Sequence, residues 1–289
     1  MMKTFRKILK NPSGLAGAII VAGLLLTALF TFLDGTFFER RITSSILHDP
    51  LKINIPEALQ GPSSAHPLGQ DRLGRDILAR ILYGSQVAVA TGFVATGLAT
   101  IMGVFLGVVT GYFGGIVDDV IMRVLEIIYS IPTLVLAMIM MSVLGPGLLN
   151  AMIAVAIMRV PSYTRVIRSQ ALSLREMDYI AAARACGSSN LRILLRHLIP
   201  NCIAPTIVQA TLGMGSAILT VASFSFLGFG IQPPGISWGS MLSEGRDVLL
   251  VAPHVATFPG IAIFLTVLGF NLLGDTLRDI LDPRLRGEI

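Results

Sequence analysis

The chain has 289 residues, of which 53% are hydrophobic and only 13% are charged, and its mean hydropathy is +0.75. Soluble domains carry about 25% charged residues, so this composition excludes a water-soluble globular enzyme and a disordered chain. The net charge of +5 does not indicate a nucleic-acid-binding protein, because no cluster of cations has interleaved aromatic residues. We therefore expect a membrane protein.

Six predominantly apolar windows are long enough to cross the bilayer as helices, which takes about 20 residues for roughly 30 Å of hydrocarbon. They cover residues 13–33, 86–112, 124–144, 148–167, 204–229 and 255–274. The first window follows a group of cations, but it is too long for the apolar region of a signal peptide and no small-residue cleavage site closes it. We interpret it as a retained anchor. The predicted fold class is an all-α membrane protein with six transmembrane helices.

The positions of Lys and Arg predict the orientation, because flanking cations remain on the cytoplasmic side during insertion. If both chain ends are inside, the inner segments and their flanks hold fifteen of the 22 cations. The predicted topology is therefore N-in, C-in. It divides the chain into a cytoplasmic N-terminus with the first helix (1–33), an extracytoplasmic segment (34–85) and a five-helix core (86–289). The core includes a basic cytoplasmic loop at about 168–201.

An amphipathic stretch closes the predicted extracytoplasmic segment. Between Gly74 and Tyr83, four apolar residues share one helical face: Ile77, Leu78, Ile81 and Leu82. This pattern predicts an interfacial helix that leads into the second span.

Small and polar residues mark two of the predicted spans. Gly103, Gly107 and Gly111 recur every four residues in the second span, so one helix face can approach a neighbouring helix closely. The fifth span carries polar side chains, which a neighbouring helix or water in a pathway would satisfy. These polar side chains are equally compatible with helix packing and with lining a pore. The candidate pathway-lining residues are Gln209, Thr211, Ser216, Thr220 and Ser223.

Motifs for nucleotide binding and for metal sites are absent from the sequence. There is no Gly-Lys dipeptide, so the nucleotide-binding pattern GxxxxGK[ST] cannot form, and there is no HExxH or CxxC motif. The histidines are isolated in the sequence, and each is expected to be a loop or interface residue: His48, His66, His197 and His254. We therefore expect no catalytic residue, no metal site and no cofactor in this chain. If ATP drives the protein, another chain binds it.

The cytoplasmic loop contains a recognisable pattern. It reads Asp178-Tyr-Ile-Ala-Ala-Ala-Arg-Ala-Cys-Gly187, and Pro200-Asn201 follows after a second helical stretch. The alanines favour a slim helix, the glycine can end it, and the proline can open the next element. The pattern resembles the EAA loop of bacterial binding-protein-dependent ABC permeases, although the Glu that names the loop falls on Ala181 and the first Ile of its closing motif falls on His197. In that family the loop forms a short coupling helix that docks into a groove on the ATPase subunit. The resemblance implies ATPase-coupling roles for Asp178, Tyr179, Ala181, Ala182, Ala183, Arg184 and Gly187.

Further motifs extend the resemblance over nearly the whole chain. They are His66-Pro-Leu-Gly-Gln-Asp-Arg-Leu-Gly-Arg-Asp76, Tyr83-Gly84, Gly111-Tyr-Phe-Gly-Gly-Ile-Val-Asp118, Ile121-Met-Arg123 and a long closing motif from Phe258 to Arg286. Together they resemble the C-type permease of dipeptide, oligopeptide and nickel importers. The resemblance implies a type I ABC importer permease fold in a bacterial inner membrane. It implies as partners a homologous B-type permease, two cytoplasmic ATPases that bind ATP and Mg, and an extracytoplasmic solute-binding protein.

The function that the resemblance implies is import of di- or oligopeptides. A nickel, glutathione or haem importer could carry a similar permease, because the binding protein selects the solute in this family. A stand-alone secondary transporter would need ion-coupling acids near the midplane, and Glu126 is the only acid within a predicted span. A purely structural assembly factor is a third alternative.

Overall fold

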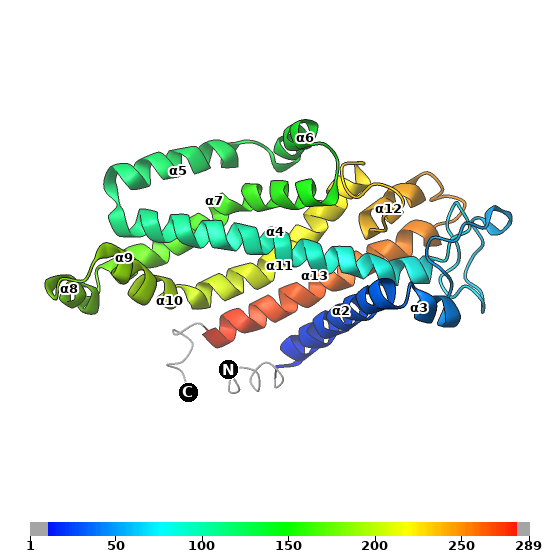
Figure 1. Ribbon diagram of the computed structural model, residues 1–289, viewed down its shortest axis with the longest axis horizontal. Helices are drawn as coiled ribbons and strands as arrows, with labels where there is room; N and C mark the ends of the chain where they lie inside the picture. Colours follow the sequence, from blue (N-terminus) through cyan, green and yellow to red (C-terminus); the bar gives the residue numbers. More distant parts are fainter. Residues whose placement is uncertain (1–10, 282–289) are drawn as a thin grey trace.

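The computed structural model describes residues 11–281, which fold almost entirely into helices (Figure 1). Within this range the only β pairing is an isolated antiparallel bridge between Gln70 and Asp76. Two groups of residues used in the sequence analysis lie outside the described range. They are the N-terminal cations (Lys3, Arg6, Lys7 and Lys10) and the end of the closing motif at 282–286.

Four helices are long and apolar enough to cross a membrane: α2 (Pro12–Phe37), α4 (Ile77–Phe113), α11 (Ile203–Phe226) and α13 (His254–Leu281). A fifth candidate is the pair α5 (Gly115–Ser130) and α6 (Thr133–Leu144), which passes the same test only when the two helices are taken together. The helix α7 (Leu148–Arg175) has 28 residues but is not among the apolar candidates. By length and composition, the described residues therefore account for four or five of the six predicted spans.

The third predicted span, 124–144, is not one continuous helix. The axes of α5 and α6 differ by 95° at the break between them. Pro132 stands at this break, and Ile131 before it is extended, with φ −83° and ψ 128°. Proline has no N–H to continue the helix, and its ring disfavours helical backbone at the preceding residue. The apolar composition predicted one straight helix over residues 124–144, but the proline divides this segment into two helices at an angle.

The predicted interfacial helix between Gly74 and Tyr83 is not a separate element. Its apolar residues form the first turns of α4, which runs without a break from Ile77 to Phe113. The Asp76 side chain begins this helix by accepting a hydrogen bond from the Ala79 N–H at 2.7 Å. A helix of 37 residues is about 55 Å long. Because this exceeds the hydrocarbon thickness, α4 reaches well beyond an apolar slab of roughly 30 Å.

The long helices lie side by side, and successive helices run in opposite directions (Figure 1). Helix α4 is central and packs against α2, α7 and α11, while α13 packs against α2 and α11. One end of the bundle carries α8 (Asp178–Ala185) and the other carries α12 (Trp238–Arg246), so we call them the α8 end and the α12 end. Short elements complete the connections: α3 (Arg41–Ile46), η1 (Ile55–Glu57), α9 (Asn190–Ile193), one π-helical turn, η2 (Leu194–Leu198), and α10 (Ile199–Asn201).

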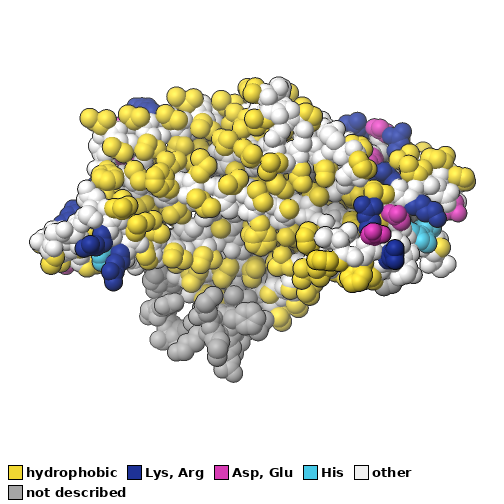
Figure 2. Space-filling view, viewed as in Figure 1, with side chains coloured by type: hydrophobic (Ala, Val, Ile, Leu, Met, Phe, Trp, Pro, Cys, Tyr) yellow, Lys and Arg dark blue, Asp and Glu magenta, His cyan; other side chains and the backbone are white. Residues whose placement is uncertain are grey.

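The surface of the bundle is apolar between its two ends. Figure 2 shows hydrophobic side chains over the middle of the molecule, with Lys, Arg, Asp, Glu and His side chains gathered at both ends. Large side chains of this belt are strongly exposed, for example Leu26 at 66%, Ile101 at 70% and Phe105 at 64%. A belt of this kind would aggregate in water but is stable against lipid. The described structure is therefore that of a multi-pass membrane protein.

Candidate functional site

The short helix α8 projects from the bundle at one end (Figure 1). Asp178 lies in its first turn and Arg184 in its last, where each charge complements the helix dipole. Gly187 then has φ +75°. Its N–H donates to the Arg184 carbonyl at 2.9 Å, and the Ser188 N–H donates to the Ala183 carbonyl at 3.0 Å. These two bonds form a Schellman motif, which favours glycine at the left-handed position.

Most of the predicted coupling residues are exposed on α8. The exposed residues are Asp178, Tyr179, Ala181, Ala182, Arg184 and Gly187, and Ala183 is half-buried. The fully buried residue of this helix is Ile180, at 0% exposure. The sequence reasoning did not select Ile180, although it is the single large aliphatic side chain in an alanine-rich stretch. The helix thus presents a slim outer face and has one apolar anchor.

The anchor joins α8 to several long helices. Ile180 belongs to a buried cluster that draws residues from α4, α7, α9, η2 and the residue before α11: Val108, Tyr112, Ile167, Ile193, Leu198 and Cys202. Tyr112 adds two polar contacts, because its hydroxyl donates to Asn190 Oδ1 at 2.8 Å and the Arg184 guanidinium lies 5.0 Å from its ring centroid. A displacement of α8 must therefore move residues that pack on α4, α7 and the start of α11.

A partly buried ion pair fixes the connection between α4 and α5 at the same end. The Arg168 guanidinium on α7 donates to both carboxylate oxygens of Asp118 on α5, with an Nε to Oδ1 distance of 2.6 Å. Asp118 is 8% exposed. The chain turns into α5 at Gly114 and Gly115, whose φ angles are +65° and +52°. Bidentate pairs of this kind fix orientation as well as distance, so the turn is held against α7.

The three glycines of α4 face α7. A Cβ atom would lie 2.3 Å from Tyr163 Cβ if added at Gly103, 2.7 Å from Ile167 Cβ at Gly107 and 2.6 Å from Ala171 Cβ at Gly111. Real Cβ atoms essentially never approach this closely. The absence of side chains lets the two helix backbones touch over more than two turns, which is a common way to join helices in lipid.

The polar residues of α11 do not gather in one place. Gln209, Thr211, Ser216, Thr220 and Ser223 are all half-buried, and the four hydroxyls donate to carbonyls one turn earlier in their own helix. Among them, Ser223 lines an open groove of about 580 Å³ between α6, α11, α12 and α13. The other groove residues are mainly apolar, including Leu134, Leu219 and Phe264. The groove thus carries little polar recognition chemistry.

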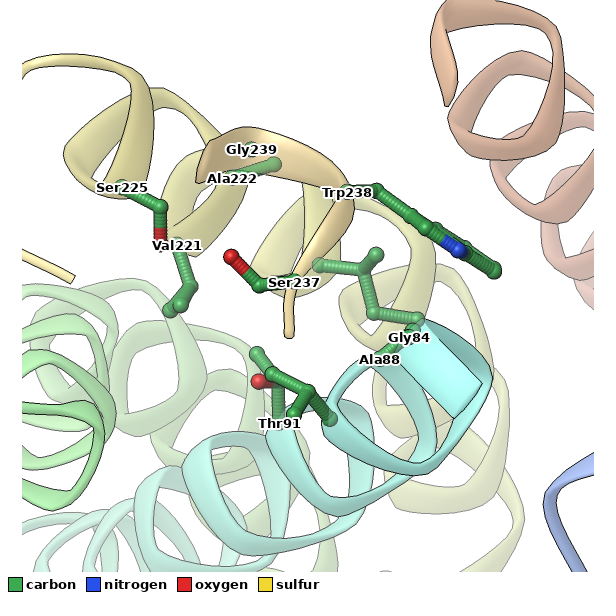
Figure 3. A pocket seen from close by; sticks show the side chains of 11 residues that line it. Gly84, Ala88, Thr91, Val221, Ala222, Ser225, Ser237, Trp238 and Gly239 are labelled. Carbon is green, nitrogen blue, oxygen red and sulfur yellow. The ribbon is translucent and has the colours of Figure 1, made fainter. Parts of the chain in front are cut away.

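A second cavity lies inside the bundle where α4, α11 and the start of α12 meet (Figure 3). The hydroxyl-bearing residues Thr91, Ser225 and Ser237 and the Trp238 ring surround it. Its volume is about 20 Å³, which is room for about one water molecule. Such a cavity cannot accommodate a solute, so helix packing closes the described bundle at this point.

At the α12 end, a network of charged residues connects the segment that leads into α4 with α12. The sequence reasoning did not find it. Arg80, which is 2% exposed, pairs with buried Asp71 and donates to Glu244 Oε2 at 2.8 Å. Arg75 bridges the same two acids at 2.7 and 2.6 Å. This network joins the loop before α4 to α12, which lies more than 160 positions later in the chain. In the sequence, the spacing Asp71-x₃-Arg75-x₄-Arg80 is the only sign of this network. No sequence pattern indicates that Glu244 takes part in it.

Comparisons with known proteins agree with this architecture. Residues 103–287 match the family described as binding-protein-dependent transport system inner membrane component. The chain is 44% identical to the dipeptide transport system permease protein DppC of Alkalihalophilus pseudofirmus, over 98% of this chain and 90% of that protein. It is 41% identical to the probable D,D-dipeptide transport system permease protein DdpC of Escherichia coli, over 96% of this chain and 90% of that protein.

Two further relatives extend the comparison. The glutathione transport system permease protein GsiD of Pectobacterium atrosepticum is 45% identical over 78% of this chain and 75% of its own length. Among solved structures, a chain of the MetNI methionine ABC transporter in inward-facing conformations superposes with a TM-score of 0.56 at 19% identity. The superposition covers 70% of this chain and 96% of that chain. At this identity the structural likeness concerns the fold alone, whereas the sequence matches span most of the chain. The chain therefore belongs to the family of inner membrane components of binding-protein-dependent transport systems, which are permease subunits of ABC importers.

Proposed function

We propose that this chain is one of two membrane subunits of an ATP-driven importer and forms half of the translocation pathway for di- or oligopeptides. The observation that carries this proposal is the architecture of the α8 end. A slim exposed helix is tied by Ile180 and Tyr112 to the ends of α4, α7 and α11. A helix held in this way can receive a push from a partner and transmit it to the bundle.

The partners follow from this role. Two cytoplasmic ATPases bind ATP and Mg, and α8 docks on one of them, with Asp178, Tyr179 and Arg184 at the contact. A homologous B-type permease completes the pathway, and an extracytoplasmic binding protein delivers the solute to the α12 end. ATP binding closes the ATPase pair and moves α8, and the buried cluster around Ile180 transmits this movement. Because ligands shift conformations only through differential interaction with the two states, α8 must remain docked in both.

The proposed topology has six spans with both chain ends in the cytoplasm. Alternating helix directions support it, with α7 as the fourth span although its arginines lower its hydropathy (Figure 1). The α8 end is then cytoplasmic. The native cysteines provide a test, because Cys186 is exposed at this end and Cys202 is buried.

A membrane-impermeant maleimide is expected to label Cys186 in inverted vesicles stripped of ATPases and not in intact spheroplasts. A Cys186→Ala, Ser64→Cys variant is expected to show the reverse pattern, because Ser64 is exposed in the loop before α4. Labelling of Cys186 from outside would overturn the orientation.

The coupling role is tested at Gly187. A Cβ there meets no atom within 4 Å, so a substitution acts through the backbone alone. Left-handed conformation costs a non-glycine residue about 1–2 kcal/mol, and asparagine tolerates it better than a β-branched residue. In the reconstituted importer, Gly187→Val is expected to lower peptide uptake per ATP hydrolysed, while Gly187→Asn stays close to wild type. Wild-type uptake by Gly187→Val would contradict the coupling role of the α8 cap.

The substrate is tested in a strain that lacks only this chain. Loss of labelled dipeptide uptake, restored by the gene, supports peptide import. Loss of nickel, glutathione or haem uptake with normal peptide uptake would assign the same role to a different importer. Solute flux driven by an ion gradient through the purified chain alone would instead indicate a secondary transporter.

A further inference from the structure

Two histidines that are isolated in the sequence meet in the structure. The ring centroids of His48 and His66 are 4.2 Å apart, and Asp76 adjoins them: its Oδ2 lies 2.8 Å from His66 Nδ1. One ligand atom from each of the three residues lies within 4.8 Å of the others. Both histidines lie in loops, as expected, but they are not isolated in space. Figure 2 shows histidine side chains beside acidic ones at the α12 end.

We propose that His48, His66 and Asp76 form a binding site for a divalent transition metal ion of the zinc class. Two imidazoles and one carboxylate are ligands that zinc accepts, and a water molecule would complete four-fold coordination. Magnesium and calcium prefer oxygen ligands, so the imidazoles disfavour them. The site lies outside the proposed transport pathway and is independent of the proposed function.

The distances suit such an ion after a small adjustment. Ligand atoms at about 2.0–2.1 Å from a tetrahedral zinc are about 3.4 Å from each other. The contact between His66 and Asp76 already lies within that separation. His48 stands on the loop that follows α3, so a rotation of its side chain can bring its ring nitrogen closer. In the described part of the chain, no hydrogen-bond partner of the His48 ring competes for it.

The surroundings already hold two of the ligands in place. Asp76 is 2% exposed, and its Oδ1 caps α4 through the Ala79 N–H. Its Oδ2 pairs with His66 Nδ1, so a bound ion would take the place of the proton between these two atoms. The opposite ring nitrogen of His66, Nε2, faces Glu57 Oε2 at 3.8 Å, and Gln70 donates to the same carboxylate oxygen at 3.1 Å. Metal-bound histidines usually donate the second ring N–H to a carboxylate. Glu57 stands on that side of the ring, at an ion-pair separation and beyond hydrogen-bond distance.

A bound ion would connect three segments of the α12 end. His48 follows α3, His66 lies in the loop before α4, and Asp76 begins α4 itself. Through its ligands the ion would act as a clamp across these three segments. Its binding should raise the thermal stability of the folded chain, because a ligand that binds only the native state stabilises that state.

The test uses the purified importer complex, treated with a chelator and then titrated with zinc chloride in competition with a fluorescent zinc indicator. Wild type is expected to bind one zinc ion per copy of this chain. His48→Ala and Asp76→Asn are expected to bind it at least about tenfold more weakly. Asparagine retains the helix cap of Asp76, so this variant should fold and keep the metal-free thermal midpoint. His197→Ala, at the α8 end, is the matched control and should bind zinc as wild type does.

A second measurement identifies the ligands. With cobalt in place of zinc, wild type and His197→Ala are expected to show the visible absorption bands of a site with nitrogen and oxygen ligands. His48→Ala is expected to lack these bands. The proposal is overturned if wild type binds no stoichiometric zinc. It is also overturned if Asp76→Asn and His48→Ala bind zinc as tightly as wild type, or if His197→Ala weakens binding to the same degree.

Discussion

The contact between α4 and α7 offers a direct test of the packing geometry through Gly103→Ala. A Cβ at this position would lie 2.3 Å from Tyr163 Cβ, whereas carbon atoms in contact are about 3.5–4.0 Å apart. The helices would have to separate by about 1 Å or more, because the obstacle is the root of the tyrosine side chain and the backbone next to it. Overpacking of this kind costs about 1–3 kcal/mol.

Gly97→Ala is the matched control. Gly97 lies on the same helix, and a Cβ there meets no atom within 4 Å. Both substitutions gain the same helix propensity, about 1 kcal/mol, so the difference between them isolates the packing term. The thermal midpoint of the purified complex in detergent is expected to be lower for Gly103→Ala than for Gly97→Ala by about 2–4 °C per kcal/mol. Equal midpoints for the two variants would refute the close approach of α4 and α7 at this position.

Three further substitutions probe the polar contacts. Asp118→Asn removes the carboxylate charge that pairs α5 with Arg168 of α7 and should cost about 1.5 kcal/mol, seen as a lower thermal midpoint. Arg123→Gln, in an exposed pair at 3.6 Å, should cost less than about 1 kcal/mol. Arg80→Ala removes the buried cation of the α12-end network and leaves Asp71 and Glu244 paired with Arg75 alone. It should cost about 1–3 kcal/mol, measured as loss of folded protein from membranes. Arg72→Ala should have little effect there, because its ion pair is exposed. Tyr112→Phe keeps the ring but loses the bond to α9, and should cost about 0.5–1.5 kcal/mol. It is expected to lower peptide uptake per ATP hydrolysed, and unchanged coupling would show that this bond transmits nothing.

Local features of the chain were predictable. The apolar windows located α2, α11 and α13 to within a few residues at most of their ends, because a bilayer selects for uninterrupted apolar length. The end of α8 at Gly187 was also predictable, since the backbone there needs a left-handed residue directly after a helix. The bend at Pro132 was missed because hydropathy averages over a window and does not register the backbone conformation that a single proline imposes.

The sequence by itself determined that this chain lies in a membrane, which segments are apolar enough to span it and which short helix resembles a coupling element. These properties depend on composition and on residues within a few turns of one another. Only the tertiary structure decided that Ile180 anchors α8 to α4, α7 and the residue before α11, that Arg80 meets Glu244 and that His48 lies against His66. Each of these contacts joins residues on different segments, and their side chains can meet only after the helices have packed.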